Sequence, residues 1–346
     1  MVDLNRTIWF PKTAINNAVH EGFNPDVDAS DITGTDVATG FIWPGRPGTW
    51  PHIGTNHIEP LDVVRSFFDH GRDTPNAYDG ITPGNVSDYV ECTIADEIGP
   101  SGGTEKVITI NLKQTKGFVP YGAGCVLRLQ TMFANTNPVP PKMPNYYHHC
   151  YFKLQSDLLS ILPVNQLHTI TEKKAGGFNG TAAGGDFRIR VGVENINGAL
   201  KMCFDVDQTA NKPGSVTTTP EGYVFIESTT SMLSRFWRVR GSGPDINVNE
   251  WYKLEYWYHR HATHGYFVLA INGQVIGENY GRTCGRYDLP FGRISVCSVY
   301  TGTNDGTGVN KFAQPELSDF PATDSILYQK AQRYFDKFPE EIPVAA

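Results

Sequence analysis

The sequence predicts an all-β protein with an irregular N-terminal extension and a C-terminal helix. The clearest evidence is residues 249–302, where runs of aromatic and β-branched residues alternate with turns and show no helical period. Asn272 and Gly273 separate two of these runs, and Asn-Gly is the strongest short signal for a β-hairpin. The composition agrees, because 35 glycines, 23 prolines and a charged fraction of only 19% are typical of a loop-rich β protein.

The predicted extension covers residues 1–85. It is rich in aspartate, glycine and proline, and only residues 60–70 carry apolar side chains at helical spacing. Such a segment cannot build its own core, so we expect it to be ordered through contacts of Trp9, Trp43 and Trp50. Those contacts are made either with the rest of the chain, which is the favoured alternative, or with a partner protein.

Alternating apolar and polar residues predict a β domain over residues 86–321. Strands are predicted at 88–95, 105–113, 124–133, 146–155, 187–193, 200–206, 223–227, 251–259, 266–271, 274–276 and 294–300. A helical turn is predicted at 156–162 and a polar loop at 209–220. In the tail, 322–346, apolar residues near helical spacing predict an amphipathic helix that packs on its own domain or on a neighbouring protein.

Composition also excludes several classes of protein. A net charge of −7 argues against a general nucleic-acid binder, and no apolar run is long enough to span a membrane. The first residues lack the apolar core of a signal peptide, so we expect a chain that does not use that route or has lost its signal. Cys125, Cys150 and Cys297 lie in apolar strand patterns, which favours buried thiols over disulfides.

The segment 146–155 is the most informative strand, because its two faces differ in character. Period two places Cys150, Phe152 and Leu154 on an apolar face. The opposite face carries Tyr147, His149, Tyr151, Lys153 and Gln155.

Two further strands also keep polar side chains on one face. Arg128 and Gln130 share a face in the first strand, and Arg188 and Arg190 share one in the second. If these strands and 146–155 are neighbours in one sheet, their polar faces form a groove. Aromatic rings there would stack on sugars, and arginines would pair with uronate carboxylates. The alternative is an ordinary solvated sheet face.

Three segments carry a family resemblance: EWYKLEYWYHR to SVCSVYTG, YYHHCYFKLQSDLLSIL and DFRIRVGVENINGALKMCFDVD. They resemble the concanavalin A-like jelly rolls, and among these the polysaccharide-lyase-like branch similar to heparin lyase I. The resemblance implies a concanavalin A-like β-sandwich with a glycan-facing groove. This architecture hosts lectins, lyases, hydrolases and structural modules, so it does not by itself imply an activity.

The resemblance also implies roles for a β-elimination, which needs a base, an acid and a cation that stabilises the enolate. The implied catalytic residues are His149, Tyr151 and Tyr300. The substrate-binding residues, taken from the polar faces of the three strands, are Arg128, Gln130, Tyr147, Lys153, Gln155, Arg188 and Arg190. In the related lyases a basic residue precedes the tyrosine on its strand, whereas here Val296 stands at that position.

Two functions therefore stay open. The favoured one is a non-catalytic, glycan-engaging surface or structural protein, such as a phage-particle decoration or adhesion module, on a virion surface or outside a cell. Its partners would be an acidic polysaccharide or cell-surface glycan, and proteins bound through the two ends of the chain. The alternative is a polysaccharide lyase that cleaves an acidic polysaccharide.

Metal ligands are also considered. His259, His261 and His264 form an HxHxxH pattern that could bind a metal, although the turn that follows favours exposed histidines. A cluster of aspartates at 26–31 could contribute to a calcium site, but it lacks the glycine of a tight calcium loop. We therefore expect no cofactor and no metal.

Overall fold

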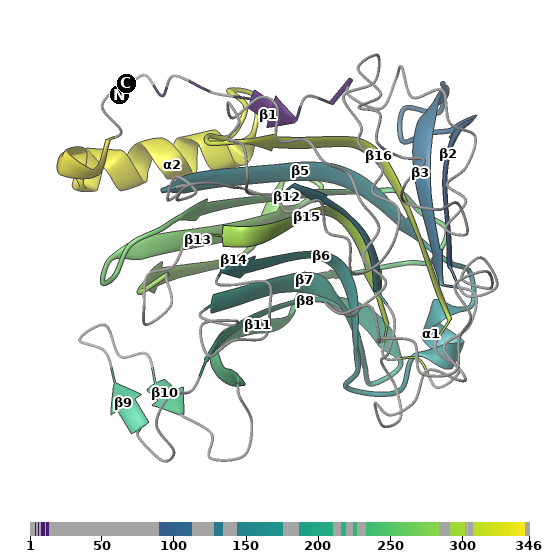
Figure 1. Ribbon diagram of the computed structural model, residues 1–346, viewed down its shortest axis with the longest axis horizontal. Helices are drawn as coiled ribbons and strands as arrows, with labels where there is room; N and C mark the ends of the chain where they lie inside the picture. The colour runs from purple at the N-terminus through teal and green to yellow at the C-terminus, as the bar shows by residue number, and fades with distance from the viewer. Residues whose placement is uncertain are drawn as a thin grey trace, which may run out of the picture.

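The computed structural model describes residues 4, 6, 8–10, 12–13, 90–112, 128–133, 144–175, 187–209, 216–218, 224–226, 233–283, 291–301, 303 and 307–342. These residues form two layers of antiparallel β-sheet, with a helix on the outer side of one layer (Figure 1). The predicted all-β sandwich with a C-terminal helix is therefore confirmed.

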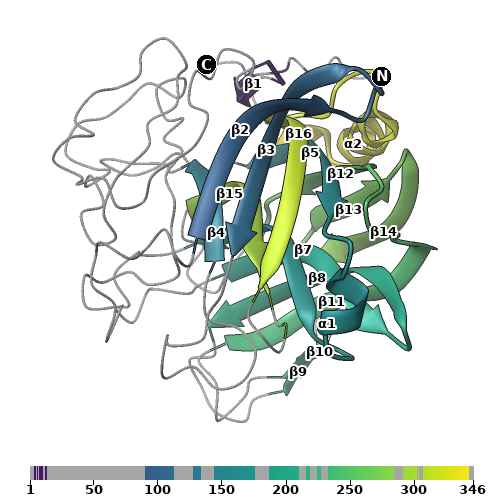
Figure 2. The same cartoon turned by 90° about the vertical axis from the view of Figure 1, so that its right-hand side faces the viewer.

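The larger layer is an eight-stranded sheet in the order β14-β13-β12-β5-β16-β3-β2, with β1 also paired to β16. Its central strands run side by side in Figure 2. The bounds of its strands are β1 Ile8–Phe10, β2 Val90–Ile98, β3 Thr104–Leu112, β5 Asn145–Leu154, β12 Tyr252–His259, β13 Gly265–Ile271, β14 Gln274–Gly281 and β16 Gly308–Ser318.

The second layer is a six-stranded sheet in the order β11-β8-β7-β6-β15-β4. Its strands are β4 Arg128–Phe133, β6 Leu167–Ala175, β7 Phe187–Ile196, β8 Ala199–Thr209, β11 Leu233–Asp245 and β15 Phe291–Tyr300. The remaining elements are a two-stranded ribbon of β9 Val216–Thr218 and β10 Val224–Ile226, the helices α1 Leu158–Ile161 and α2 Ile326–Lys337, and the short 3-10 helix η4 Pro339–Glu341.

The core lies between the two sheets. Phe204 of β8 stacks on Phe267 of β13 with ring centroids 3.9 Å apart, which marks the inner face of each sheet. On β5, Cys150, Phe152 and Leu154 are buried in this core, as the two-residue period predicts. Cys150 and Cys297 are buried thiols, as predicted, whereas Cys125 lies outside the described residues.

Three long strands are missing from the sequence-based assignment: β6, β11 and β16. Their sequences, LHTITEKKA, LSRFWRVRGSGPD and GVNKFAQPELS, mix charges, glycine or proline into the alternation, and that weakens the pattern. The prediction of a polar loop at 209–220 is wrong for residues Val216–Thr218, because they form strand β9, which pairs with β10.

Helix α2 packs on the outer face of the eight-stranded sheet, on the side away from the six-stranded sheet (Figure 1). Ser325 caps its first turn by accepting a hydrogen bond from the Leu327 N–H at 3.1 Å. Its apolar stripe packs against the sheet; the buried residues of this contact are Tyr147, Trp257, Tyr266, Val268 and Ala270 from the sheet and Leu327, Ala331, Tyr334 and Phe335 from α2. The predicted amphipathic helix is confirmed, and it packs on its own domain.

Most predictions for the extension lie outside the described residues. These include the side chains of Trp9, Trp43 and Trp50, the helix at 60–70 and the aspartates Asp26, Asp28 and Asp31. The described part of the extension includes β1, where Ile8 is the register partner of Ser318 in β16, so this segment lies against the sandwich. The domain boundaries after residues 85 and 321 stay predictions.

Within the described residues, no helix has the length and apolar character needed to cross a membrane.

Gly192 of β7 allows a close approach of β6, and this predicts an effect of substitution. A Cβ atom at this position would lie 2.1 Å from the carbonyl oxygen of His168, and this backbone cannot move without disturbing the pairing of Thr169 with Gly192. We expect Gly192→Ala to lower the free energy of unfolding by about 1–3 kcal/mol in urea denaturation. Gly103→Ala is the control, since its Cβ would meet only the Ser101 hydroxyl oxygen at 3.5 Å. Equal stability of the two variants would contradict the close approach.

Candidate functional site

The polar residues predicted from sequence lie in two different sheets. Strand β5, which carries Tyr147, His149, Tyr151 and Lys153, belongs to the eight-stranded sheet, and Gln155 follows it directly. Strands β4, β7 and β15 belong to the six-stranded sheet; they carry Arg128, Gln130, Arg188, Arg190 and Tyr300. The prediction of one groove built from neighbouring strands is therefore wrong. The three residues proposed as catalytic are likewise divided between the two layers.

The polar face of β5 is also more covered than predicted. Tyr147 is buried under α2, and its hydroxyl donates to Glu255 Oε1 at 2.6 Å. His149 is buried as well, with Nδ1 donating to the carbonyl of Gln314 at 3.0 Å, and burial lowers the pKa of His149 to about 4. The expectation that these two side chains face an open groove is wrong, because α2 packs over Tyr147 and His149 is buried against the backbone of Gln314 in the neighbouring strand β16.

The rest of the β5 face is half-buried. The rings of Tyr151 and His149 meet edge to face, with centroids 5.4 Å apart. The Lys153 ammonium lies 4.7 Å from the centroid of the Trp251 ring. Gln155 donates to Asp157 Oδ1 at 2.8 Å. Lys153 and Gln155 thus have their partners in the segments next to the sheet, and Tyr151 meets His149 through its ring.

The outer face of the six-stranded sheet carries a cluster of charged side chains joined by ion pairs. Ile189, Val191 and Val193 of β7 point into the core, so Arg188 and Arg190 point outward by the two-residue period. Directly paired residues of neighbouring strands point to the same side of a sheet. Glu172 of β6 and Asp205 of β8 are both register partners of Arg190, so they also point outward. We call the following set the arginine face: Arg188, Arg190, Arg238 and Arg240, with Glu172, Glu194 and Asp205.

Ion pairs connect β7, β8 and β11 across this face. Asp205 lies between two arginines, with Oδ2 3.3 Å from Arg190 Nη2 and Oδ1 2.9 Å from Arg238 Nε. Glu194 also contacts two, namely Arg238 and Arg240, the latter with Nε at 2.6 Å from Oε2. Each of these two carboxylates thus fixes two guanidinium groups, which limits the conformations that the arginines can adopt.

The carboxylates and the arginines of the arginine face differ in how far their side chains are buried. The side chains of its three carboxylates are 0–2% exposed, whereas those of its four arginines are 13–34% exposed, with Arg240 the highest. The third carboxylate, Glu172, pairs with Arg188. Burial, and then the charges of Arg240 and Arg190, lower the pKa of Arg238. The partly exposed side chains of the arginine face are therefore its arginines, and four cations against three anions leave one positive charge in excess.

Register places more polar residues in this sheet. Arg293, Lys174, Arg188 and Asp207 are successive partners across β15, β6, β7 and β8. At the far edge of the sheet, Arg128 of β4 pairs with Tyr300 of β15, and Gln130 pairs with Ser298. Five of the residues predicted from sequence thus lie on three strands of one sheet.

Sequence reasoning missed Arg238, Arg240, Glu172, Glu194 and Asp205 as members of this face. The first three lie on β11 and β6, two strands that were not predicted. A signal was present in the sequence, because Arg238-Val239-Arg240 repeats the Arg-x-Arg alternation of Arg188-Ile189-Arg190.

Comparisons with known proteins give similarity in structure but not in sequence. No family model and no curated protein matches the chain. The alginate lyase vAL-1 from Chlorella virus is 10% identical, with a TM-score of 0.40 over 66% of this chain and 89% of that one. The alginate lyase from Klebsiella pneumoniae is 10% identical, with a TM-score of 0.37 over 65% and 83%. The carbohydrate recognition domain of Emp46p is 10% identical, with a TM-score of 0.28 over 70% and 94%.

Likenesses of this size do not carry an activity over to the chain. The fold and the site together define a jelly-roll β-sandwich whose six-stranded sheet has a charged, arginine-rich outer face.

Proposed function

We propose that the arginine face binds an acidic polysaccharide or cell-surface glycan, and that the chain is a glycan-engaging surface or structural protein. The observation that carries this proposal is the cluster of four partly exposed arginine side chains paired with three buried carboxylates. A guanidinium presents its N–H donors in a planar fork, and this geometry matches the carboxylate or sulfate groups of an acidic glycan.

The buried carboxylates support binding in a second way. A flexible arginine loses side-chain entropy when it binds a ligand, whereas Arg190, Arg238 and Arg240 are already held by Asp205 and Glu194. Local charge also outweighs the total charge of −7 at short range, because salt screens interactions beyond a Debye length of about 8 Å. An acidic ligand is therefore compatible with an acidic protein.

The alternative, a polysaccharide lyase, has less support. A β-elimination needs the base, the acid and the enolate-stabilising group around one sugar. The residues proposed for these roles, His149, Tyr151 and Tyr300, come from opposite layers of the sandwich.

Acidic polysaccharides and cell-surface glycans lie outside cells. The proposed function therefore includes an extracellular or virion-surface location for this protein.

Arg190→Lys/Arg240→Lys tests the proposal. Lysine keeps the positive charge beside Asp205 and Glu194 but loses the planar fork, so the fold should persist while pairing with ligand carboxylates weakens. We expect the wild type to bind uronate polymers and not neutral dextran in isothermal titration calorimetry. The double variant should bind at least about tenfold more weakly, a loss of about 1.4 kcal/mol.

Lys106→Ala is the matched control, because Lys106 forms an exposed ion pair with Asp96 in the other sheet. It should bind like the wild type. Two results would overturn the proposal. One is equal affinity of the wild type for uronate polymers and neutral dextran, and the other is equal affinity of the wild type and the double variant for uronate polymers. Appearance of the ultraviolet absorbance of an unsaturated uronate during the titration would instead establish the lyase.

A further inference from the structure

The C-terminal helix and strand β14 carry a second group of aromatic and charged side chains. Tyr280 of β14 is 41% exposed, and its ring stacks on that of Tyr266 in β13 with centroids 4.3 Å apart. Tyr266 is buried in the contact between α2 and the sheet, where it stacks in turn on Tyr334 of α2 at 5.8 Å. The exposed ring of Tyr280 therefore rests on a rigid support that reaches into the core.

Three cations lie along the flank of α2 that faces β14. Lys330, Arg333 and Lys337 follow one another at spacings of three and four residues, which places them on one side of the helix. Lys330 Nζ donates to Glu278 Oε2 of β14 at 2.6 Å, and Lys337 Nζ lies 5.8 Å from the centroid of the Tyr280 ring. The cations are therefore on the same side of α2 as the exposed tyrosine.

Glu278 supplies a fixed hydrogen-bond acceptor between the helix and the strand. Its Oε2 accepts from the Tyr266 hydroxyl at 2.7 Å as well as from Lys330. Burial raises the pKa of Glu278, but hydrogen bonds from Lys330 and Tyr266 and the charges of Lys330 and Arg333 outweigh burial and lower this pKa overall. The carboxylate is therefore ionised at neutral pH, and its side chain is 36% exposed.

Two of the three cations are open to solvent. Arg333 and Lys337 are exposed, and neither forms an ion pair with a carboxylate of the described part of the chain. Glu278 pairs with Lys330 alone among the three. The flank of α2 beside Tyr280 therefore presents positive charge that the protein itself does not neutralise.

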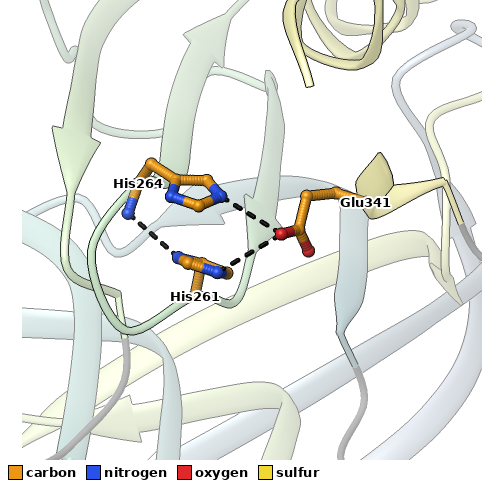
Figure 3. Close-up of side chains that lie close together, drawn as sticks. All are labelled: His261, His264 and Glu341. Carbon is orange, nitrogen blue, oxygen red and sulfur yellow. Dashed lines mark hydrogen bonds and ion pairs between the residues drawn. The ribbon is translucent and has the colours of Figure 1, made fainter. Parts of the chain in front are cut away.

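Histidines in the turn after β12 hold the C-terminal segment that follows α2. His261 and His264 are directed toward the Glu341 carboxylate of η4 (Figure 3). Their Nε2 atoms lie 3.3 and 3.1 Å from Glu341 Oε1, within hydrogen-bonding distance. The sequence favoured exposed histidines here, but His259 is buried and the other two are half-buried.

The same turn fixes the last residues of α2. The Phe338 ring stacks on His264 with centroids 4.6 Å apart, and the Tyr334 hydroxyl donates to the His264 carbonyl at 2.8 Å. Lys337 lies between these two residues in the chain, so its backbone is held in place relative to Tyr280. The aromatic ring and the cations beside it are thus positioned by packed elements rather than by a loop.

We propose that Tyr280, Glu278, Arg333 and Lys337, which we call the helix site, bind one acidic sugar unit. The apolar face of the sugar stacks on the exposed tyrosine ring. Arg333 and Lys337 are about 6 Å apart along the helix, so both reach one sugar carboxylate. The ionised Glu278 accepts hydrogen bonds from sugar hydroxyl groups.

The class of ligand rests on the proposed function, because an acidic glycan is also the ligand proposed for the arginine face. The helix site itself is separate, since it belongs to the eight-stranded sheet and α2 and shares no residue with the arginine face. One chain then holds acidic glycan at both layers of the sandwich. Such a protein links two glycan strands, which suits a surface or structural role.

The test is isothermal titration calorimetry with a uronate tetrasaccharide, in the Arg190→Lys/Arg240→Lys background that weakens the arginine face. We expect this background to retain binding. Adding Tyr280→Ala, which removes the stacking ring, or Arg333→Gln, which removes the carboxylate partner, should weaken it at least about fivefold. Lys106→Gln in the same background is the matched control for the loss of one cation, and it should leave binding unchanged.

The inference fails if either Tyr280→Ala or Arg333→Gln binds the tetrasaccharide as tightly as the background does. It also fails if poly-L-glutamate binds the background as tightly as the tetrasaccharide does, since the site would then be one for acidic peptides. Circular dichroism establishes that each variant is folded. If Tyr280→Ala does not fold, Arg333→Gln decides, because its side chain is exposed on the helix.

Titrations without the background changes separate this inference from the proposed function. If Arg190→Lys/Arg240→Lys binds like the wild type while Tyr280→Ala weakens binding, the arginine face is not a glycan site and the helix site stands. The opposite pattern overturns the helix site and leaves the proposed function intact.

Discussion

Phe335→Ala is expected to lower the free energy of unfolding by about 3–5 kcal/mol, the usual cost of removing a fully buried phenylalanine. Phe335 lies at the centre of the contact between α2 and the eight-stranded sheet, and its side chain is completely buried. Its ring meets Trp257 at 5.9 Å and Phe320 at 5.8 Å, both in edge-to-face geometry. Alanine would leave a cavity that these rigid rings cannot fill.

Equilibrium urea denaturation measures this effect, and limited proteolysis reports the release of the C-terminal segment. Ile326→Ala is the control on the same helix, because Ile326 is 37% exposed and its loss should change stability by less than about 0.5 kcal/mol. A Phe335→Ala loss as small as that of the control would mean that α2 does not rest on the sheet in solution.

Lys173→Met is expected to stabilise the protein by about 1–4 kcal/mol, the range seen when buried ion pairs are replaced by apolar residues of similar volume, because methionine removes the cost of burying the ammonium group. Lys173 of β6 points between the sheets and is fully buried. Its Nζ lies 2.8 Å from the centroid of the Tyr146 ring and 4.2 Å from that of Tyr256. Among the described residues it has no hydrogen-bond partner, so the rings offset only part of its lost hydration.

The pH dependence gives this prediction a second test. Burial lowers the pKa of Lys173 well below its usual value, so the unfolded state binds more protons between the folded and unfolded pKa values. The stability of the wild type therefore rises with pH across that window. The advantage of Lys173→Met should be largest below the folded pKa and shrink as the pH approaches the ordinary pKa of lysine.

Urea denaturation of the wild type and Lys173→Met at a series of pH values measures both effects. Lys106→Met is the matched control, since Lys106 is on the outside and its substitution should leave stability within about 0.5 kcal/mol. Lower stability of Lys173→Met at neutral pH would mean that contacts between the lysine and the tyrosine rings outweigh the cost of burial.

Local features could be predicted from sequence because their causes are local. Backbone geometry sets the two-residue period of β5, so the apolar face of Cys150, Phe152 and Leu154 followed from the sequence. The hairpin after β13 followed from Asn272 and Gly273, which adopt φ values of 48° and 77°. The spacing of apolar residues likewise predicted α2. In each case a few neighbouring residues decide the conformation.

The candidate site could be predicted only in part, because only some of its residues lie on strands that a local sequence pattern reveals. Arg188 and Arg190 were found because their strand alternates cleanly, whereas Arg238, Arg240 and Glu172 lie on strands whose patterns glycine, proline or charge interrupts. Alternation shows that two residues share a face of one strand. It does not show which sheet receives the strand, and so β5 was placed beside β4 and β7 in error.

The sequence by itself determined the all-β class, the faces of individual strands and the terminal helix. The tertiary structure decided which strands are neighbours, which polar faces are covered and which distant residues meet. Pairing β5 with β12 and β16 joins residues at least one hundred positions apart, and the meeting of Glu341 with His264 depends on where α2 docks. Such contacts depend on how all apolar faces of the chain are buried together, and no local pattern encodes that arrangement.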